Sequence, residues 1–250
     1  MPPAEPAAPP TLPDPVARFD SAQRRTISMA RELFRRLEAG MSERDLFELA
    51  ETQLGAFGFS RWYHPPEVRI GGRPFGPLVV PSARRRLAAG ELVAIDLAPA
   101  EDDCYGDFCA TVSFGAPEPK VVGVARDCVR ATCGYASRWK TVGELFIVAK
   151  AWAVNQRMDL ANRDSVGHRV LPREGLVATG FPRSAHLATF LGRNRVHRLN
   201  PVRMAGMFAI RPEVRDHDTV AAFEEIVWVQ DEVRWVLGRD NPAEAGQLGP

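Results

Sequence analysis

Apolar residues recur at three- and four-residue steps along residues 16–39, and Gly40 follows this stretch. Its apolar positions include Phe19, Ile27, Ala30, Leu33, Phe34 and Leu37. This spacing places the apolar side chains on one face of a helix, and a glycine is typical of the position after a helix end. A second helix is expected after Ser42, because Ser42 and Asp45 approximate a capping box and leucines follow at helical spacing.

From residue 59 onward, short aliphatic runs alternate with proline, glycine and polar turns, which is typical of strands. The runs ELVAIDLAP (91–99) and YGDFCATVSFG (105–115) predict a hairpin, and helices are expected over 120–138 and 142–157. The last strands are predicted in GMFAIRPEV (206–214), AAFEEIVWV (221–229) and EVRWVLG (232–238). The order of elements predicts an α+β protein with helices packed on a curved antiparallel sheet.

Composition refines this picture. Seven prolines fall within residues 1–15, so we expect a flexible tail there, and residues 240–250 have a similar character. We expect one domain over residues 16–239. Lysine and arginine total 32 against 31 acidic residues, a balance that argues against nucleic-acid or membrane-surface binding. No apolar run reaches the ~18–20 residues of a membrane span, and no secretory signal is evident, so a cytoplasmic location is expected.

Two aspartates stand inside otherwise apolar strands. Asp96 lies in IDLA and Asp107 in GDFCAT, where an ionised carboxylate is costly unless it has a partner. In the predicted hairpin the two could face each other, and a divalent cation or a guanidinium between them would compensate their repulsion. The alternative is that one caps a turn while the other faces solvent on an edge strand.

Two further positions could carry chemistry. Strand alternation allows only one of Glu224 and Glu225 to face the core, so one is expected to be buried or functional and the other solvated. His168 follows Gly167 in SVGHRV; taken alone, such a histidine is more typical of a structural residue than of a ligand. The other histidines, His64 included, stand in uninformative contexts.

Taken in order, these segments resemble the pita-bread family of methionine aminopeptidases, aminopeptidase P, prolidase and creatinase. The family has an aspartate in an apolar strand and a second one eleven residues later in a G-D-x-x-x-T context. It then has a G-H motif, a G-M-x-F-x-I-E-P segment and a glutamate after an aromatic residue. The matching residues are Asp96, Gly106, Asp107, Thr111, Gly167, His168, Phe223 and Glu224. The resemblance covers about residues 16–239 and implies the pita-bread fold.

The resemblance also implies a two-metal hydrolase. Asp96 would hold one metal, Asp107 and Glu224 would bridge the two, and His168 would be a terminal ligand of the other. A bridging water would be the nucleophile, and histidines near the substrate would stabilise the tetrahedral intermediate and the leaving amine.

Three departures from the family pattern surround this expected site. Arg211 takes the place of the ligand glutamate, which removes a ligand and the general base and adds a charge that repels metal. Glu213, two residues later, would substitute if the strand register shifts. The histidine that the peptidases carry before Asp96 is missing from GGRPFGPLVV, and FPRSAH, with Arg183 and His186, replaces the usual continuation after His168.

We therefore expect a divergent metalloenzyme, hydrolase-like or repurposed for a small-molecule substrate such as a biosynthetic intermediate. One divalent transition metal (Mn, Fe, Co or Zn) would be held by Asp96, Asp107, His168 and Glu224. Catalytic roles are expected for His168, Glu224 and Glu213. Arg211, with Arg183 and His186, is expected to bind a small-molecule or peptide substrate; Arg211 could instead neutralise the vacated metal position.

Two alternatives stay open. In a metal-free, creatinase-like enzyme, His168 would be the acid/base, while Arg211 and Glu224 would clamp the substrate. In a non-catalytic binding module, a salt-bridge cluster of Asp96, Arg211 and Glu224 would fill the former metal site. The chain is expected to be a monomer or a homodimer, with the aromatic residues of its C-terminal strands in the core rather than in an interface.

Overall fold

A computed structural model describes residues 12–75, 80–170 and 194–239. Its α-helices are α1 (Asp14–Arg35), α2 (Glu43–Gln53), α3 (Lys120–Tyr135) and α4 (Val142–Asn155), with a 3-10 turn at Gly55–Phe57. Its strands are β1 (Arg61–Ile70), β2 (Leu92–Glu101), β3 (Cys104–Tyr105), β4 (Phe108–Ser113), β5 (Asp159–Leu160), β6 (Gly167–Val170), β7 (Gly206–Ile210), β8 (Glu213–Asp216), β9 (Thr219–Ala222), β10 (Glu225–Gln230) and β11 (Val233–Val236).

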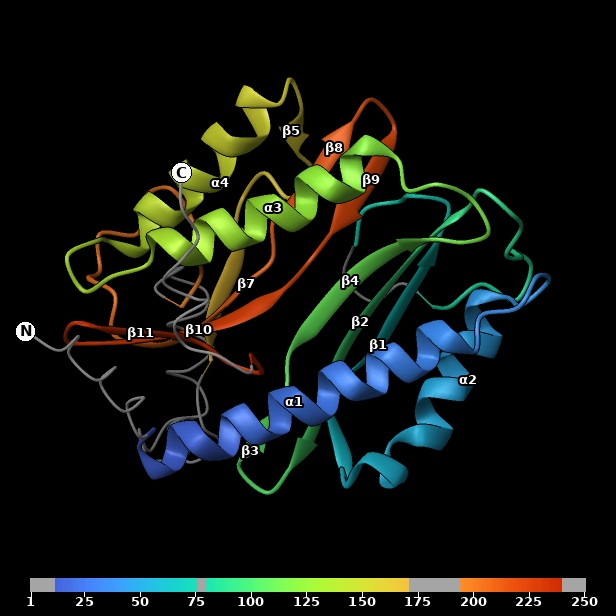
Figure 1. Cartoon of the computed structure of the whole chain (residues 1–250), viewed down its shortest axis with the longest axis horizontal. Helices are drawn as coiled ribbons and strands as arrows, with labels where there is room; N and C mark the ends of the chain where they lie inside the picture. Colours follow the sequence, from blue (N-terminus) through green and yellow to red (C-terminus); the bar gives the residue numbers. More distant parts are fainter. Residues whose placement is uncertain (1–11, 76–79, 171–193, 240–250) are drawn as a thin grey trace, which may run out of the picture.

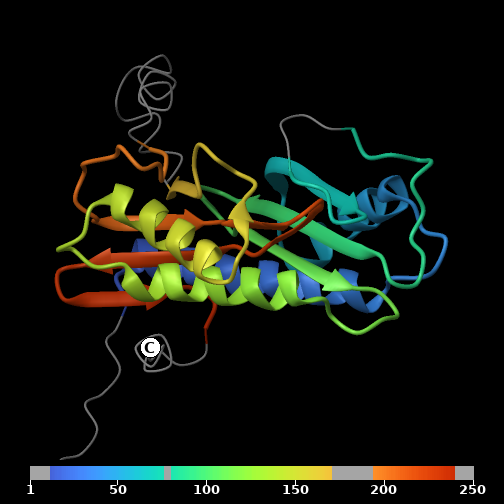
Figure 2. The ribbon, with the colours of Figure 1, turned by 90° about the horizontal axis from the view of Figure 1, so that it is seen from above.

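The described strands form three antiparallel sheets. In the first, β2 pairs with β1, β3 and β4; the second has the order β11-β10-β7-β6, and the third β5-β8-β9. Helix α1 packs on β2, β3 and β4, and α3 packs on β7 to β10 (Figure 1). Seen at right angles, α1 and α3 run along the same side of the strands (Figure 2). This arrangement matches the expected α+β class with helices on antiparallel sheets.

Helix α1 begins at Asp14, inside the segment expected to be a flexible tail, and ends at Arg35, four residues before the predicted end. Pro15 is compatible with this start, because the first N–H groups of a helix have no intrahelical acceptor to lose. Helix α2 begins as predicted, with Ser42 and Asp45 forming a reciprocal capping box. Helix α4 is opened by the same device at Thr141 and Glu144.

Two predicted strands are each broken into two. GMFAIRPEV forms β7 and β8 with Arg211 and Pro212 between them, and AAFEEIVWV forms β9 and β10 with Phe223 and Glu224 between them. The breaks lie side by side, since Ile210 pairs with Glu225 in one sheet and Glu213 with Ala222 in the next. The chain therefore passes twice between the second and third sheets, at neighbouring positions. Arg211 and Glu224 lie at these two crossings.

The core consists of three apolar clusters beneath the helices. One joins α3 and α4 to the C-terminal strands, one joins the start of α1 to β10 and β11, and one joins α1 and α2 to β1 and β2. Trp228 and Trp235 are buried in the second cluster, as expected for core aromatics. The clusters fix the strands whose ends meet at the cavity described next.

Candidate metal centre

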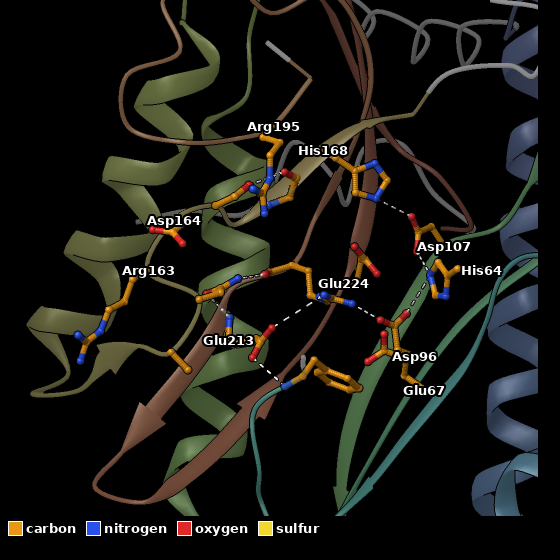
Figure 3. A pocket seen from close by; sticks show the side chains of 16 residues that line it. His64, Glu67, Asp96, Asp107, Arg163, Asp164, His168, Arg195, Glu213 and Glu224 are labelled. Atoms are coloured by element: carbon orange, nitrogen blue, oxygen red, sulfur yellow. Dashed lines mark hydrogen bonds and ion pairs between the residues drawn. The ribbon is translucent and has the colours of Figure 1, made fainter. Parts of the chain in front are cut away.

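A cavity of about 670 Å³ opens where the three sheets meet. Its walls come from β1, β2, the start of β4, β6 and the two strand crossings, with the segment 161–165 on one side (Figure 3). The acidic residues at its wall are Glu67, Asp96, Asp107, Asp164, Glu213 and Glu224, and the basic ones are His64, Arg163, His168, Arg195 and Arg211. Acidic and basic groups that lie far apart in sequence therefore converge on one space.

Asp96 and Asp107 lie close together in this cavity, as the hairpin predicted. Asp96 is in the middle of β2 opposite Cys109, and Asp107 immediately precedes β4. Both side chains are 1% exposed. The backbone of Asp107 is held by Gln23 of α1: the side-chain amide donates to the carbonyl of Asp107 at 2.9 Å, and the N–H of Asp107 donates to Gln23 Oε1 at 2.8 Å.

Two of the expected ligands, Asp107 and His168, each follow a glycine. At both glycines a neighbouring atom lies so close to the backbone that a Cβ would not fit. A Cβ at Gly106 would be 2.0 Å from the hydroxyl oxygen of Thr26 in α1. A Cβ at Gly167 would be 2.0 Å from the carbonyl oxygen of Ala209 in β7. These close approaches fix the backbone on which the side chains of Asp107 and His168 stand.

Three of the expected ligands form one group, which we call the His168 triad: Asp107, His168 and Glu224. Their potential ligand atoms all lie within 4.8 Å of one another. His168 Nε2 is 3.1 Å from Asp107 Oδ2. The backbone N–H of Glu224 donates to the carbonyl of Cys109 at 2.9 Å, which fixes the β9–β10 crossing against β4.

A second group, the His64 triad, consists of His64, Asp96 and Asp107 within the same limit. His64 Nε2 lies 3.9 Å from Asp96 Oδ1 and 4.0 Å from Asp107 Oδ1. The four expected ligands therefore divide between two neighbouring triads that share Asp107, and Asp96 is grouped with His64 rather than with His168.

Arg211 lines the cavity and forms an ion pair with Asp96 Oδ2. Its backbone N–H donates to the carbonyl of Val166 at 2.7 Å. Its guanidinium carbon lies 5.1 Å from the ring centre of Phe75, and Nη2 lies 3.9 Å from Glu213 Oε1. A permanent cation thus lies beside a carboxylate that the family resemblance assigns to a metal.

The buried charges shift one another's pKa. Burial, and then the charge of Asp107, raise the pKa of Glu224 well above its ordinary value. Burial would raise the pKa of Asp107 too, but the hydrogen bond and charge of His168 outweigh it and lower this pKa. Enclosure alone would lower the pKa of His168, yet its contact with Asp107 raises it. Without a bound cation, these shifts favour the ionised form of Asp107 and the protonated form of Glu224.

The pKa values around Arg211 follow from the same competition. Burial raises the pKa of Asp96, although the guanidinium of Arg211 opposes the shift. Burial would lower the pKa of Arg211, but the charges of Asp96 and Glu224 raise it well above its ordinary value. Arg211 is therefore a fixed positive charge at any pH at which the protein folds.

The structure places the remaining expected residues as follows. Glu213 begins β8 and lines the cavity, but it belongs to neither triad; its Oε2 accepts the backbone N–H of Phe75 at 3.1 Å. Arg183 and His186 lie outside the described residues. The expectation that either Glu224 or Glu225 is solvated is wrong, because both are buried and Glu225 is paired with Arg239 on the other side of the strand.

Sequence reasoning missed two residues of the site. His64 comes from β1, 32 positions before Asp96, and no local motif marks it. Gln23 lies among the apolar positions of α1, where a fully buried glutamine could have been noticed as a polar residue on the core face of the helix. The predicted absence of a histidine concerned residues 71–80, whereas His64 reaches the cavity from β1, outside that segment.

Comparison with known proteins supplies the family. The sequence profile of metallopeptidase family M24 matches residues 17–231, which is most of the chain. The chain belongs to this family. A methionine aminopeptidase A from Synechocystis sp. is 29% identical over 94 residues, which make up 36% of this chain and 37% of that protein. The M24 membership confirms the resemblance that the ordered motifs indicated.

Solved structures of similar proteins confirm the pita-bread fold. Prolidase from Pyrococcus furiosus superposes with a TM-score of 0.73 at 15% identity, over 92% of this chain and 65% of that one. Methionine aminopeptidase from Thermotoga maritima gives 0.72 at 15%, over 92% and 98%. Dipeptidase PepE from Mycobacterium ulcerans gives 0.73 at 18%, over 92% and 59%. This M24 chain therefore spans about 60–65% of the length of two of these structures. Among its described helices, none is long and apolar enough to cross a membrane.

M24 proteins bind divalent metals, and the His168 triad fits such an ion. It offers one imidazole and two carboxylates, a mixed N/O set suited to Mn, Fe, Co or Zn. Glu224 Oε2 is buried and accepts no hydrogen bond from the described residues, a cost that a cation would remove. The family's second position does not fit as well, because Arg211 stands where the resemblance expects a ligand carboxylate.

Proposed function

We propose that this M24 protein is a divergent metal-dependent enzyme with a single tightly held divalent ion. Asp107, His168 and Glu224 would hold the ion, and Arg211 would replace the second cation of the family site. The reaction class we favour is hydrolysis of an amide bond in a small molecule or short peptide, or a related reaction on a small biosynthetic substrate. The observation that carries this proposal is the ion pair between Arg211 and Asp96 beside an intact triad.

Electrostatics supports one tight ion rather than two. Two like unit charges about 4 Å apart repel by roughly 4 kcal/mol near a protein surface, and a divalent ion doubles this. An ion bound at Asp96 would lie next to the Arg211 guanidinium and bear this repulsion. An ion in the His168 triad would instead meet Glu224 Oε2, which has no hydrogen-bond donor among the described residues, and the carboxylate of Asp107, whose pKa is lowered by its contact with His168.

The chain's own groups suggest distinct roles. A divalent ion in the triad would supply Lewis acidity for the attack of water on a carbonyl group. Glu224 would ligate the ion, and Glu213, which lines the same cavity but belongs to neither triad, can accept a proton from water there. Arg211 can keep Asp96 neutralised while it presents its remaining N–H groups to a substrate carbonyl or carboxylate.

The proposed function is tested by amide hydrolysis under metal control. Protein stripped with a chelator would be assayed on a panel of dipeptides and aminoacyl amides, before and after addition of Mn²⁺, Fe²⁺, Co²⁺ or Zn²⁺. We expect turnover only with metal, and a loss of at least 100-fold in kcat for Glu224→Gln. Turnover that survives chelation but is abolished by His168→Ala would instead support a metal-free mechanism with His168 as the acid/base.

A non-catalytic binding module is the second candidate, and one observation favours it: Arg211 satisfies part of the charge of Asp96 without any metal. If the protein is such a module, neither the wild type nor Asp107→Ala should bind metal. Asp107→Ala should then only lower the free energy of unfolding. Retention of a tight ion by the wild type, lost in Asp107→Ala, would exclude this candidate.

A further inference from the structure

We propose that residues 195–203, together with Trp139, form a docking surface for an acidic peptide segment of a partner protein. We call this surface the arginine strip. It begins at the candidate metal centre, because Arg195 lines that cavity, and it ends where Arg203 donates to the backbone carbonyl of Trp139, between α3 and α4. Figure 2 shows residues 195–203, in orange, on the side of the strands opposite α1 and α3. The inference goes beyond the proposed function and does not depend on a bound ion.

The positive charge of the strip has no counter-charge among the described residues. Residues 194–203 contain Arg195, His197, Arg198 and Arg203 and no acidic residue. The three arginines are exposed, and none of them forms an ion pair with a carboxylate of the described residues. The whole chain carries a formal charge of only +1, so this excess is a local property of the strip. A local positive surface of this kind favours association with a negatively charged partner.

Exposed apolar side chains lie among these charges. Leu199 is 72% exposed, Trp139 62% and Val202 39%. The N–H of Val142 donates to the carbonyl of Val202 at 2.8 Å, which holds residues 195–203 against the segment that carries Trp139. Single exposed apolar residues are ordinary, but an exposed tryptophan beside arginines has the composition of a protein interface. The strip can therefore bind apolar side chains as well as carboxylates.

Buried anchors fix the backbone of the strip. Val196 is 0% exposed and its N–H donates to the carbonyl of Gly167 at 2.8 Å. Asn200 is 3% exposed; its side-chain amide donates to the carbonyl of Arg195 at 2.9 Å, and its Oδ1 accepts the N–H of Val202 at 3.1 Å. A surface whose backbone is already ordered loses little conformational entropy when a partner binds.

The chemistry of the strip favours an acidic peptide as its occupant. Guanidinium groups bind carboxylates through paired hydrogen bonds, and Leu199 and Val202 suit the aliphatic side chains of a peptide. Single-stranded nucleic acids instead stack their bases on successive aromatic rings, and Trp139 is the one large aromatic ring of the strip. Residues 171–193, which lie outside the described residues, contain three arginines and one glutamate, so their charge does not complement the strip. An acidic segment of another protein does.

The test is the fluorescence anisotropy of a labelled peptide of glutamate and leucine, titrated with the full-length chain in chelator. The same peptide with glutamine in place of glutamate is the second probe. We expect the wild type to bind the glutamate peptide at least tenfold more tightly, and the difference to shrink as salt is added. Arg198→Glu should weaken this binding at least tenfold, and Trp139→Ala at least threefold. Arg31→Glu, which reverses an exposed arginine of α1, is the matched control and should leave it unchanged.

Three results would overturn the inference: no binding of the glutamate peptide, equal binding of the two peptides, or equal binding by the wild type and Arg198→Glu. Tighter binding of a labelled uridine oligonucleotide, lost in Arg198→Glu, would also overturn it and identify a nucleic-acid surface instead. Unchanged melting temperatures of the variants would show that they are folded. Because the titration contains no metal, its failure would leave the proposed function standing, and loss of the metal centre would leave the strip.

Discussion

Arg211 brings a permanent positive charge to a cavity wall that is rich in carboxylates. It is 27% exposed, pairs with Asp96 and lies over the ring of Phe75. Removing one partner of such a largely buried pair leaves the other as an unpaired charge, which costs more than the pair contributes when intact. At the residue scale, we therefore expect the stability of this protein and its affinity for metal to be coupled through Asp96.

Arg211→Met should lower the free energy of unfolding of the metal-free protein by about 3 kcal/mol, the low end for a broken buried pair. Added divalent metal should restore part of this loss, because a cation can then neutralise Asp96. Urea unfolding with and without metal measures both effects. Arg36→Met, which breaks a pair whose arginine side chain is 54% exposed, is the control and should cost less than about 1 kcal/mol. Equal losses in the two variants would contradict the coupling.

At the scale of elements, α1 positions the candidate metal centre although it lines neither triad. Gln23 is fully buried and exchanges two hydrogen bonds with the backbone of Asp107, while Thr26 packs against Gly106. Asp107 belongs to both triads, so its backbone position sets the geometry of each. Helix α1 thus fixes the backbone of Gly106 and Asp107, the two residues just before β4.

Gln23→Met should remove both bonds at nearly constant volume and leave a buried N–H and a buried carbonyl without partners. We expect a loss of about 3 kcal/mol in the free energy of unfolding and metal binding at least tenfold weaker. Gln53→Met is a matched control: Gln53 is also a buried helical glutamine, but its amide has no hydrogen-bond partner among the described residues. A similar loss in the control, or unchanged metal affinity in Gln23→Met, would contradict the positioning role.

The regular elements and the aspartate pair could be predicted because their signals are local. Helical spacing, capping boxes and an apolar strand interrupted by Asp96 are all visible within a few residues. The strand breaks at Arg211 and Glu224 could not be predicted, because alternation continues through them and only pairing with different sheets separates their halves. Glu225 shows the same limit, since its burial depends on Arg239, which lies 14 positions further along the chain.

Short sequence motifs were enough to predict four residues of the site. Ordered short matches brought Asp96, Asp107, His168 and Glu224 into one expectation, and the structure brings them to one cavity. Their division into two triads depends on His64, whose position follows from the register of β1 against β2, including two irregularities in that pairing. Such irregularities arise from tertiary packing and leave no periodic pattern in the sequence.

At the scale of the whole molecule, the His168 triad joins parts of the chain that separate sheets hold. Asp107 comes from the β3–β4 connection of the first sheet, His168 from β6 of the second, and Glu224 from the crossing between the second and third. An ion bound by all three would link these sheets. Its binding free energy then adds to the stability of the whole fold, because the unfolded chain cannot present the same three ligands together.

Saturating metal should therefore raise the melting temperature. At a free metal concentration 100 times Kd, the gain is about 2.7 kcal/mol, or roughly 5–10 °C for a chain of this size. Differential scanning calorimetry in chelator and in buffered metal measures the shift. Glu224→Gln should show little of it, whereas a full shift in that variant would place the stabilising ion elsewhere.

The most direct measurement is metal content per chain, by plasma mass spectrometry, after exhaustive dialysis of protein that has been exposed to Mn²⁺, Fe²⁺, Co²⁺ or Zn²⁺. We expect about one retained ion in the wild type, none in Asp107→Asn, and about two in Arg211→Glu, where a carboxylate returns to the second position. No retained ion in the wild type, or two ions despite Arg211, would contradict it.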